Sequence, residues 1–88
     1  MRWSVSMSPE AEKQLSKFGR YTQRIIASWI DKHLDGCEDP RATGKPLSAN
    51  LVGRWRYRIG DYRMIAEIRD SEIVILIVKI GHRREVYD

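Results

Sequence analysis

Residues 55–63 read WRYRIGDYR. Apolar and basic side chains alternate along it, which is typical of a β-strand with one buried face. Gly60 and Asp61 are a two-residue turn signal between the two halves of the stretch. The sequence therefore predicts a β-hairpin with strands at residues 54–59 and 62–69.

The length of this turn also predicts the register of the hairpin. Three pairs of residues should lie directly opposite each other: Ile59 with Tyr62, Arg58 with Arg63, and Tyr57 with Met64. Opposite side chains point to the same face, with Cβ atoms roughly 5 Å apart. Two guanidinium groups are therefore expected side by side, with that of Arg56 on the diagonal. The other face is apolar and is expected to pack against helices, through Trp55, Tyr57, Ile59, Tyr62 and Met64.

Like charges placed opposite each other destabilise a sheet, and arginine does not lose its proton to relieve the repulsion. The arrangement is favourable if an anion occupies that face. Guanidinium groups bind phosphate through two parallel hydrogen bonds, so a phosphodiester is the natural candidate. The alternative is a solvated face on which the long side chains splay apart, and charge spacing alone leaves both interpretations open.

The N-terminal part of the chain predicts one strand and two helices. Residues 2–7 alternate between polar and apolar and predict a strand with one buried face. Residues 8–19 predict a helix, with Ser8 as N-cap, Pro9 at the first helical position and Gly19 just past the end. Residues 21–36 carry apolar side chains at helical spacing and predict a second helix. The short gap at Gly19 indicates an antiparallel helical hairpin.

The rest of the chain predicts a loop and a central strand. Residues 37–53 contain prolines and glycines without a sustained period and are expected to form mostly loop, with a short turn near residues 47–51. A tight turn at residues 70–71 should lead into a strand at 72–80, and Gly81 is expected to bend or bulge the chain. The element order β-α-α-β-β-β indicates an α+β fold. It is a small, twisted, mainly antiparallel sheet with the helical hairpin packed on one face.

Composition limits the classes of protein that the chain can be. Its 88 residues predict one domain, residues 1–88, with a single small core. The formal net charge of +4 favours polyanionic partners, nucleic acid above all. The single cysteine, Cys37, excludes an internal disulfide and a cysteine-rich metal site, and it favours a reducing, cytoplasmic location. The longest apolar run, residues 73–78, is too short to span a bilayer, so no membrane association is expected.

The C-terminal residues add a second group of candidates. Arg83 and Arg84 follow the last predicted strand, with His82 and Tyr87 close by in the sequence. If the tail folds back along the sheet, Arg83, Tyr87 and His82 would reach the arginine face. There they could neutralise a phosphate, exchange a proton or stack on a base. The simpler interpretations are a tyrosine that plugs the core and a histidine on the surface.

Two segments, GKPLSANLVGRWRYRIGDYRMIAEI and VKIGHRREVYD, resemble the RelE family of toxins within the broader RelE/ParE superfamily. The resemblance spans the whole chain. It implies a small α+β toxin of a type II toxin–antitoxin system, an endoribonuclease that cleaves mRNA in the A site of the 30S ribosomal subunit without a metal or other cofactor. In that reaction the 2′-hydroxyl attacks the adjacent phosphate and gives a 2′,3′-cyclic phosphate. The resemblance also implies a cognate RelB-like antitoxin that blocks the toxin.

The resemblance assigns roles to individual residues. Arg63 matches a phosphate-stabilising arginine of the family, Arg83 the arginine after the last strand, and Tyr87 the C-terminal tyrosine. Arg56 and Arg58 occupy positions where some members carry lysine, and an arginine cannot exchange a proton as a tuned lysine can. Arg56 and Arg58 are therefore expected to act as electrostatic clamps. The 2′-hydroxyl proton would pass to Tyr87, to His82 or to a group on the ribosome. Further RNA contacts are expected from Arg54, Arg56, Arg58 and Arg84.

Three other functions remain open at this stage. A ParE-like toxin would inhibit DNA gyrase and cleave no RNA, although the full set of arginines and the tyrosine favours the nuclease. A non-catalytic RNA-binding module would show salt-dependent affinity for RNA but leave the message intact. A toxin remnant would have lost its activity. Trp29, on the second predicted helix, is expected to be a core residue without a functional role.

Overall fold

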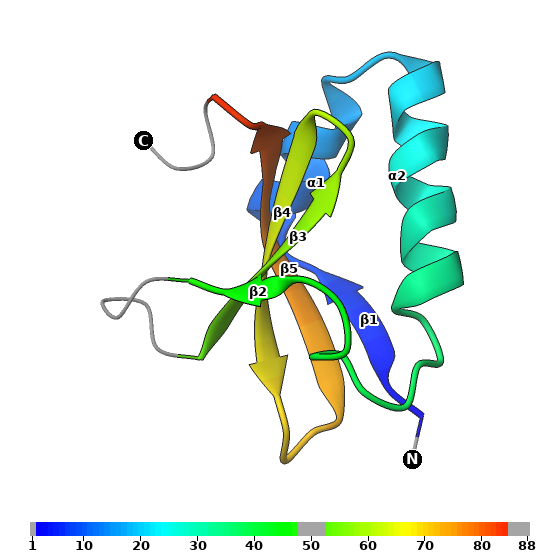
Figure 1. Cartoon of the computed structure of the whole chain (residues 1–88). Coiled ribbons are helices and arrows are strands. Elements are labelled where there is room, and N and C mark those ends of the chain that lie inside the picture. The colour runs from blue at the N-terminus through cyan, green and yellow to red at the C-terminus, as the bar shows by residue number, and fades with distance from the viewer. Residues whose placement is uncertain (1, 48–52, 85–88) are drawn as a thin grey trace.

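The computed structural model describes residues 2–47 and 53–84, which form five strands and two helices (Figure 1). The five strands make one sheet in the order β1-β5-β4-β3-β2. The predicted α+β class is confirmed, and the sheet is mixed, since β1 runs parallel to β5 while the other pairs are antiparallel. The elements are β1 (Ser4–Met7), α1 (Pro9–Ser16), α2 (Arg20–His33), β2 (Lys45–Pro46), β3 (Arg54–Ile59), β4 (Tyr62–Arg69) and β5 (Val74–His82).

The hairpin of β3 and β4 forms around the turn at Gly60 and Asp61 with the predicted register. Ile59 pairs with Tyr62, Arg58 with Arg63, and Tyr57 with Met64. Gly60 has a φ of 58°, a left-handed conformation that glycine adopts without steric cost. The alternation along the sequence therefore separates an apolar face from a basic face, as predicted.

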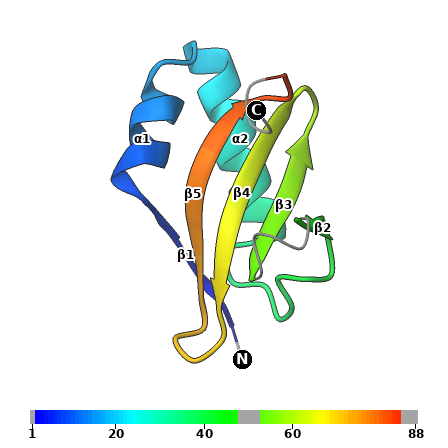
Figure 2. The same ribbon diagram turned by 90° about the vertical axis from the view of Figure 1, so that its left-hand side faces the viewer.

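Both helices contribute to one core on the apolar face of the sheet. Figure 2 shows α1 beside β5 and α2 passing behind the strands. Ser8 is the N-cap of α1, since its Oγ accepts a hydrogen bond from the backbone N–H of Ala11 at 3.1 Å, while Gly19 precedes α2 at its N-cap position. Within the described residues, neither helix is long and apolar enough to cross a bilayer. The core cluster consists of Ala11, Ile26, Ile30, Leu34, Tyr57, Ile59, Met64, Ala66, Ile75, Ile77 and Ile80.

The connection between β4 and β5 is longer than the sequence predicted. The expected two-residue turn at 70–71 is wrong: residues 70–73 form the loop, and β5 begins at Val74 opposite Arg69. Ile73 adopts a φ of 56°, which is uncommon for a β-branched residue. Its carbonyl accepts a hydrogen bond from the N–H of Ser4 at 3.2 Å, so the loop is fixed to the start of the parallel strand β1. Propensity rules do not anticipate a left-handed isoleucine.

A β-bulge interrupts β5, at Val78 and not at Gly81 as expected. Ile65 pairs with Lys79 and Ala66 with Ile77, so Val78 is an extra residue on β5. A bulge reverses the alternation of side chains beyond it. Strict alternation would place Lys79 with Ile75 and Ile77 on the core face, whereas the bulge turns it to the opposite face.

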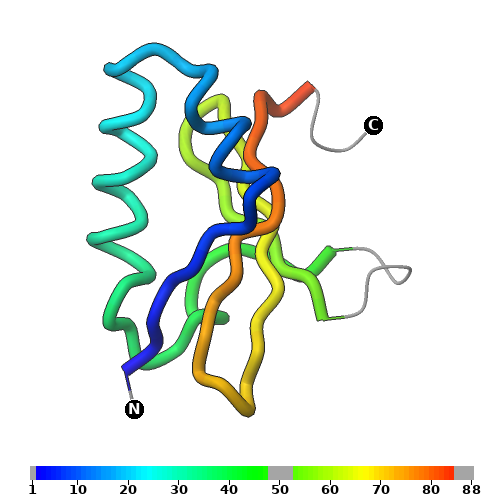
Figure 3. Tube along the Cα trace, turned by 180° about the vertical axis from the view of Figure 1, so that it is seen from behind, coloured from blue at the N-terminus to red at the C-terminus, as the bar shows by residue number. Residues whose placement is uncertain are grey.

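Two side chains of the α1 region form hydrogen bonds with the backbone at this bulge. The hydroxyl of Ser8 donates to the carbonyl of Val78 at 3.3 Å. The amide oxygen of Gln14 accepts a hydrogen bond from the N–H of Ile80 at 2.7 Å. The pairing of β1 with β5 ends at Met7 and Ile77, so α1 takes over as partner of β5 where β1 stops. Figure 3 shows this passage from β1 into α1 along the upper part of β5.

The segment between α2 and β2 was predicted as loop, and the structure fixes it against β3. The buried hydroxyl of Tyr57 donates to the carbonyl of Pro40 at 2.6 Å, and the indole N–H of Trp55 donates to the carbonyl of Thr43 at 2.7 Å. Gly44, with a φ of 78°, lies directly against β3. Two residues then pair with β3 as β2, and the turn expected near residues 47–51 lies outside the described residues after Leu47.

Substitution of Gly44 tests this close approach. A Cβ at position 44 would collide with the carbonyl oxygen of Arg56 and lie 2.7 Å from the indole nitrogen of Trp55. We expect Gly44→Ala to lower the free energy of unfolding by about 2 to 4 kcal/mol in urea denaturation, as the sum of backbone strain and overpacking.

Gly36→Ala is the matched control, because Gly36 has a φ of 77° and an added Cβ would meet no atom within 4 Å. It should lose only the strain contribution, about 1 kcal/mol. Equal losses in the two variants would show that the contact with β3 contributes nothing.

Candidate functional site

Seven basic side chains share the face of the sheet that points away from the helices, and we call this set the cationic face. The strand pairings place Lys45, Arg56, Ile65 and Lys79 in one row across four strands. The next row contains Arg58, Arg63 and Gly81. Residues opposite each other share a face, and alternate residues of a strand do as well, so the cationic face comprises Lys45, Arg54, Arg56, Arg58, Arg63, Arg69 and Lys79.

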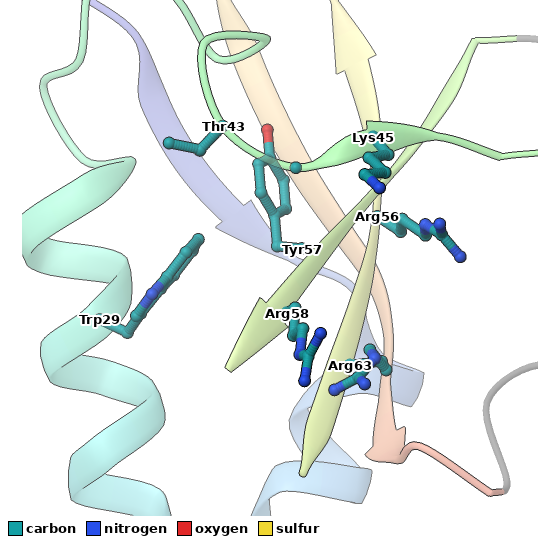
Figure 4. A pocket seen from close by; sticks show the side chains of 8 residues that line it. Trp29, Thr43, Lys45, Arg56, Tyr57, Arg58 and Arg63 are labelled. Atoms are coloured by element: carbon teal, nitrogen blue, oxygen red, sulfur yellow. The ribbon is translucent and has the colours of Figure 1, made fainter. Parts of the chain in front are cut away.

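Arg58 and Arg63 lie side by side, as the hairpin register predicted (Figure 4). Nη1 of Arg63 donates to the carbonyl of Gly60 at 2.8 Å and to that of Tyr62 at 3.0 Å. These bonds hold the guanidinium at the turn, and its Nε and Nη2 hydrogens have no protein acceptor among the described residues. Gly81 lies opposite Arg63 on β5 and contributes no side chain there. A fixed guanidinium with free donors beside an open position is suited to bind an oxyanion.

The chain after β5 returns to the same end of the sheet. The backbone N–H of Arg83 donates to the carbonyl of Asp61 at 2.8 Å, which docks the residue against the hairpin turn. Arg83 and Arg84 are both exposed. The structure therefore brings Arg83 to the end of the sheet that carries Arg58 and Arg63. Tyr87 lies outside the described residues, so its expected approach stays a prediction.

The structure does not bring His82 to the cationic face. His82 pairs with Tyr62, which belongs to the face that packs on the helices. Its ring lies edge-on to that of Tyr62, with centroids 5.9 Å apart, and Tyr62 in turn contacts Phe18 at 5.0 Å. Nδ1 of His82 accepts a hydrogen bond from the N–H of Arg84 at 3.3 Å. In this arrangement His82 belongs to an aromatic cluster at the end of the sheet.

Sequence reasoning missed Lys79 and Lys45 as members of the cationic face. Lys79 is the only charged residue of β5 apart from His82, and a lone charge in an apolar strand is a signal of an exposed position. Strict alternation along β5 would place it on the core face, and only the bulge at Val78 turns it to the opposite face. Lys45 joins the face because β2 pairs with Arg56, a pairing that the loop sequence did not indicate.

Carboxylates are few on this face. Glu67 lies opposite Arg54, and its Oε1 is 3.6 Å from Nε of Arg69. Asp61 is exposed in the hairpin turn. In residues 2–47 and 53–84, no group of three or more histidine, cysteine, aspartate or glutamate side chains is placed to hold a metal ion. Positive charge therefore predominates on the described part of the face.

A cleft of about 430 Å³ opens beside the cationic face, between α2 and the outer edge of β3. Trp29 of α2 forms one side, and Arg58 of β3 lies across from it (Figure 4). The indole of Trp29 is half-buried and packs against the rings of Tyr57 and His33, with centroids 5.6 and 4.7 Å away. The cleft is lined by Trp29, Thr43, Gly44, Lys45, Arg56, Tyr57, Arg58 and Arg63.

Tyr57 supports the floor of this cleft and gives the fold a pH dependence. Its side chain is fully buried, and burial raises the pKa of the phenol well above its usual value of 10.0. The folded state therefore keeps the proton at a pH where the unfolded chain loses it. The stabilisation is complete below pH 10 and decreases as the pH rises further, by up to ~1.4 kcal/mol per pH unit.

We expect Tyr57→Phe to remove this pH dependence. At pH 7 the variant should be about 1 to 2 kcal/mol less stable, because the carbonyl of Pro40 loses its hydrogen bond. Between pH 9 and 11 the difference from the wild type should shrink, as measured by urea denaturation at each pH. Cys37, whose pKa burial also raises, is present in both proteins. A difference that stays constant up to pH 11 would contradict the assignment.

Known proteins share this sequence pattern and this geometry. A family model described as the ParE toxin of type II toxin–antitoxin systems, parDE, matches residues 5–87. The toxin RelG of Mycobacterium tuberculosis is 30% identical over 88 residues, which cover 99% of this chain and 98% of that protein.

Solved structures agree with this match. The toxin–antitoxin complex RelBE2 of Mycobacterium tuberculosis contains a chain that superposes with a TM-score of 0.84 at 25% identity, covering 97% of this chain and 95% of that one. The isolated RelE toxin of E. coli superposes with a TM-score of 0.75 at 20% identity, covering 97% and 90%. The second likeness concerns the fold alone.

Proposed function

The chain belongs to the RelE/ParE superfamily of toxins of type II toxin–antitoxin systems, and on that basis we propose that it is a ribosome-dependent endoribonuclease that cleaves mRNA in the A site. The observation that carries the proposal is the cationic face, where Arg58 and Arg63 lie side by side with no carboxylate in their row. Like charges in this arrangement cost stability unless an anion lies between them. A phosphodiester of RNA is an anion whose oxygens match guanidinium donors.

In the proposed reaction the arginines stabilise charge and the RNA supplies the nucleophile. The 2′-oxygen of the ribose attacks the adjacent phosphorus while the bond from phosphorus to the 5′-oxygen breaks. The products are a 2′,3′-cyclic phosphate and a 5′-hydroxyl, and the proton lost by the 2′-hydroxyl balances the one gained by the leaving oxygen. Arg63 and Arg83 neutralise the charge that develops on the phosphoryl oxygens, as donors in an oxyanion hole do.

The proton of the 2′-hydroxyl must pass to another group, and a guanidinium cannot accept it. Tyr87, from its match to the family's C-terminal tyrosine, is one carrier in this proposal, and a ribosomal group is another. Lys79 is a further residue of the cationic face with a side chain able to exchange a proton, and it lies one row from Arg63. The β-bulge turns Lys79 to this face, where its side chain adds positive charge beside the bound phosphate.

A cognate antitoxin of the RelB type is the proposed protein partner. Support comes from the RelBE2 complex, whose toxin chain shares the fold and 25% of the sequence. An exposed set of arginines favours an acidic segment as the part of the antitoxin that covers it. Binding there would block the phosphate site directly.

The second candidate function is inhibition of DNA gyrase, and the name of the matching family model favours it. The 30% identical relative, RelG, and the 25% identical chain of the RelBE2 complex favour the RelE branch instead. A gyrase inhibitor needs no arrangement of arginines around a scissile phosphate. A supercoiling assay with purified gyrase, run beside the cleavage assay, separates the two functions.

Cleavage on programmed ribosomes is the direct test of the proposed function. Purified protein is incubated with ribosomes that carry a defined message in the A site, and the product ends are mapped. We expect cuts within the A-site codon that end in a cyclic phosphate. Intact message together with inhibited supercoiling would overturn the proposal in favour of gyrase inhibition.

Arginine variants test the phosphate site. We expect Arg63→Ala and Arg83→Ala each to lower the cleavage rate by at least about 100-fold and to abolish growth arrest, because each removes donors to the developing charge. Arg24→Ala is the matched control, since Arg24 is exposed on α2 and lies outside the cationic face. Circular dichroism checks that all three variants fold. If both active-site variants cleave as fast as Arg24→Ala, the phosphate site is wrong.

Lys79 variants separate charge from proton transfer. We expect Lys79→Met to cleave about tenfold more slowly, and Lys79→Arg to regain most of the rate because it restores the positive charge. The same assay, run at several pH values, measures both. A Lys79→Arg variant as slow as Lys79→Met would instead make the exchangeable proton of Lys79 the essential feature.

A further inference from the structure

We propose that the cleft beside Trp29 binds one unstacked nucleobase of the RNA while the neighbouring phosphate lies on Arg58 and Arg63. This inference rests on the proposed function in one respect, because both take RNA as the ligand. It adds a base-binding site to the phosphate site, and hence a physical origin for preference among codons. The two parts of the ligand meet different walls of the same cleft.

The first wall is aromatic. Trp29 packs against the rings of Tyr57 and His33, which fixes the orientation of its indole, and it lines the open cleft. Stacking of a base on an aromatic side chain contributes about 1 to 3 kcal/mol and accepts any base. A core role alone, as the sequence suggested, would leave the indole without an open side.

The second wall is an open strand edge. β2 pairs only with Trp55 and Arg56, so the outer edge of β3 from Tyr57 to Ile59 has no neighbouring strand in the described sheet. In a hairpin closed by a two-residue turn, Ile59 exchanges both hydrogen bonds with Tyr62, and alternate residues point their backbone groups outward. The N–H and C=O of Arg58 therefore face the cleft. One donor beside one acceptor complements the edge of a nucleobase.

The mouth of the cleft is cationic. The cleft is lined by Trp29 and by four basic residues, Lys45, Arg56, Arg58 and Arg63. An anionic group attached to the base would therefore lie close to positively charged side chains. The volume of about 430 Å³ is in the range of small-ligand sites. Thr43 and Gly44 close the remaining side, and the close contact of Gly44 with β3 keeps that wall in place. Aromatic wall, strand edge and positive mouth together fit a nucleotide better than an isolated phosphate.

Titration of isotope-labelled protein with single nucleotides tests this site without the ribosome. AMP, GMP, CMP and UMP are compared with ribose 5-phosphate, which carries the phosphate but no base. We expect the nucleotides to shift the amide signals of Thr43, Gly44 and Arg58 and the indole signal of Trp29. The purines should bind most tightly because they stack over a larger area. Equal affinity for ribose 5-phosphate, or shifts confined to arginine side chains, would overturn the base site.

Variants of Trp29 provide the second test. Trp29→Leu should lose about tenfold in nucleotide affinity, and Trp29→Phe should keep most of it because an aromatic face remains. Trp3→Leu is the control, since Trp3 is also a half-buried tryptophan but does not line the cleft. If Trp29→Leu does not fold, the titration of the wild-type protein still decides. Unchanged affinity in a folded Trp29→Leu variant would overturn the site.

The two proposals fail separately. Base-dependent binding in the cleft without cleavage on ribosomes would keep the base site and overturn the nuclease. Cleavage on ribosomes without base-dependent shifts in the wild-type protein would keep the nuclease and overturn the base site. If the protein both cleaves mRNA and binds a base in the cleft, Trp29→Leu should also change which codons are cut.

Discussion

The two-residue turn at Gly60 and Asp61 sets the pairing of β3 with β4, and the remaining architecture depends on that pairing. It assigns every second residue of the hairpin to the core and the others to the opposite face. A shift by one residue would bury guanidinium groups and expose the apolar row, at a cost far above the stability of a small domain. The same constraint that closes the core therefore also places Arg58 beside Arg63.

The bulge at Val78 extends this arrangement to a third strand. It needs α1, because the side chains of Ser8 and Gln14 bond to the backbone of Val78 and Ile80 where β1 no longer pairs. α1 thus influences which side chains lie on the cationic face, although the helix itself packs on the opposite face of the sheet. Lys79 reaches the cationic face only because α1 can satisfy the interrupted edge of β5.

Sequence patterns predicted the helices, the hairpin register and the paired arginines, since each follows from local rules of alternation, capping and turn length. They did not predict the position of Lys79, which depends on an irregularity satisfied by residues about seventy positions away in the chain. The cleft could not be predicted from sequence either, because the hydrogen bonds of Tyr57 and Trp55 to the loop before β2 have no local sequence signal. Trp29 was assigned to the core alone for the same reason.

The crowding of Arg58 and Arg63 has a consequence for the lifetime of the protein. Repulsion between them makes the empty chain less stable than any complex in which an anion neutralises both. Ligand binding and resistance to unfolding are therefore linked, and the unbound protein opens more often. Since cellular proteases cleave opened chains, occupancy of this surface would govern turnover as well as activity.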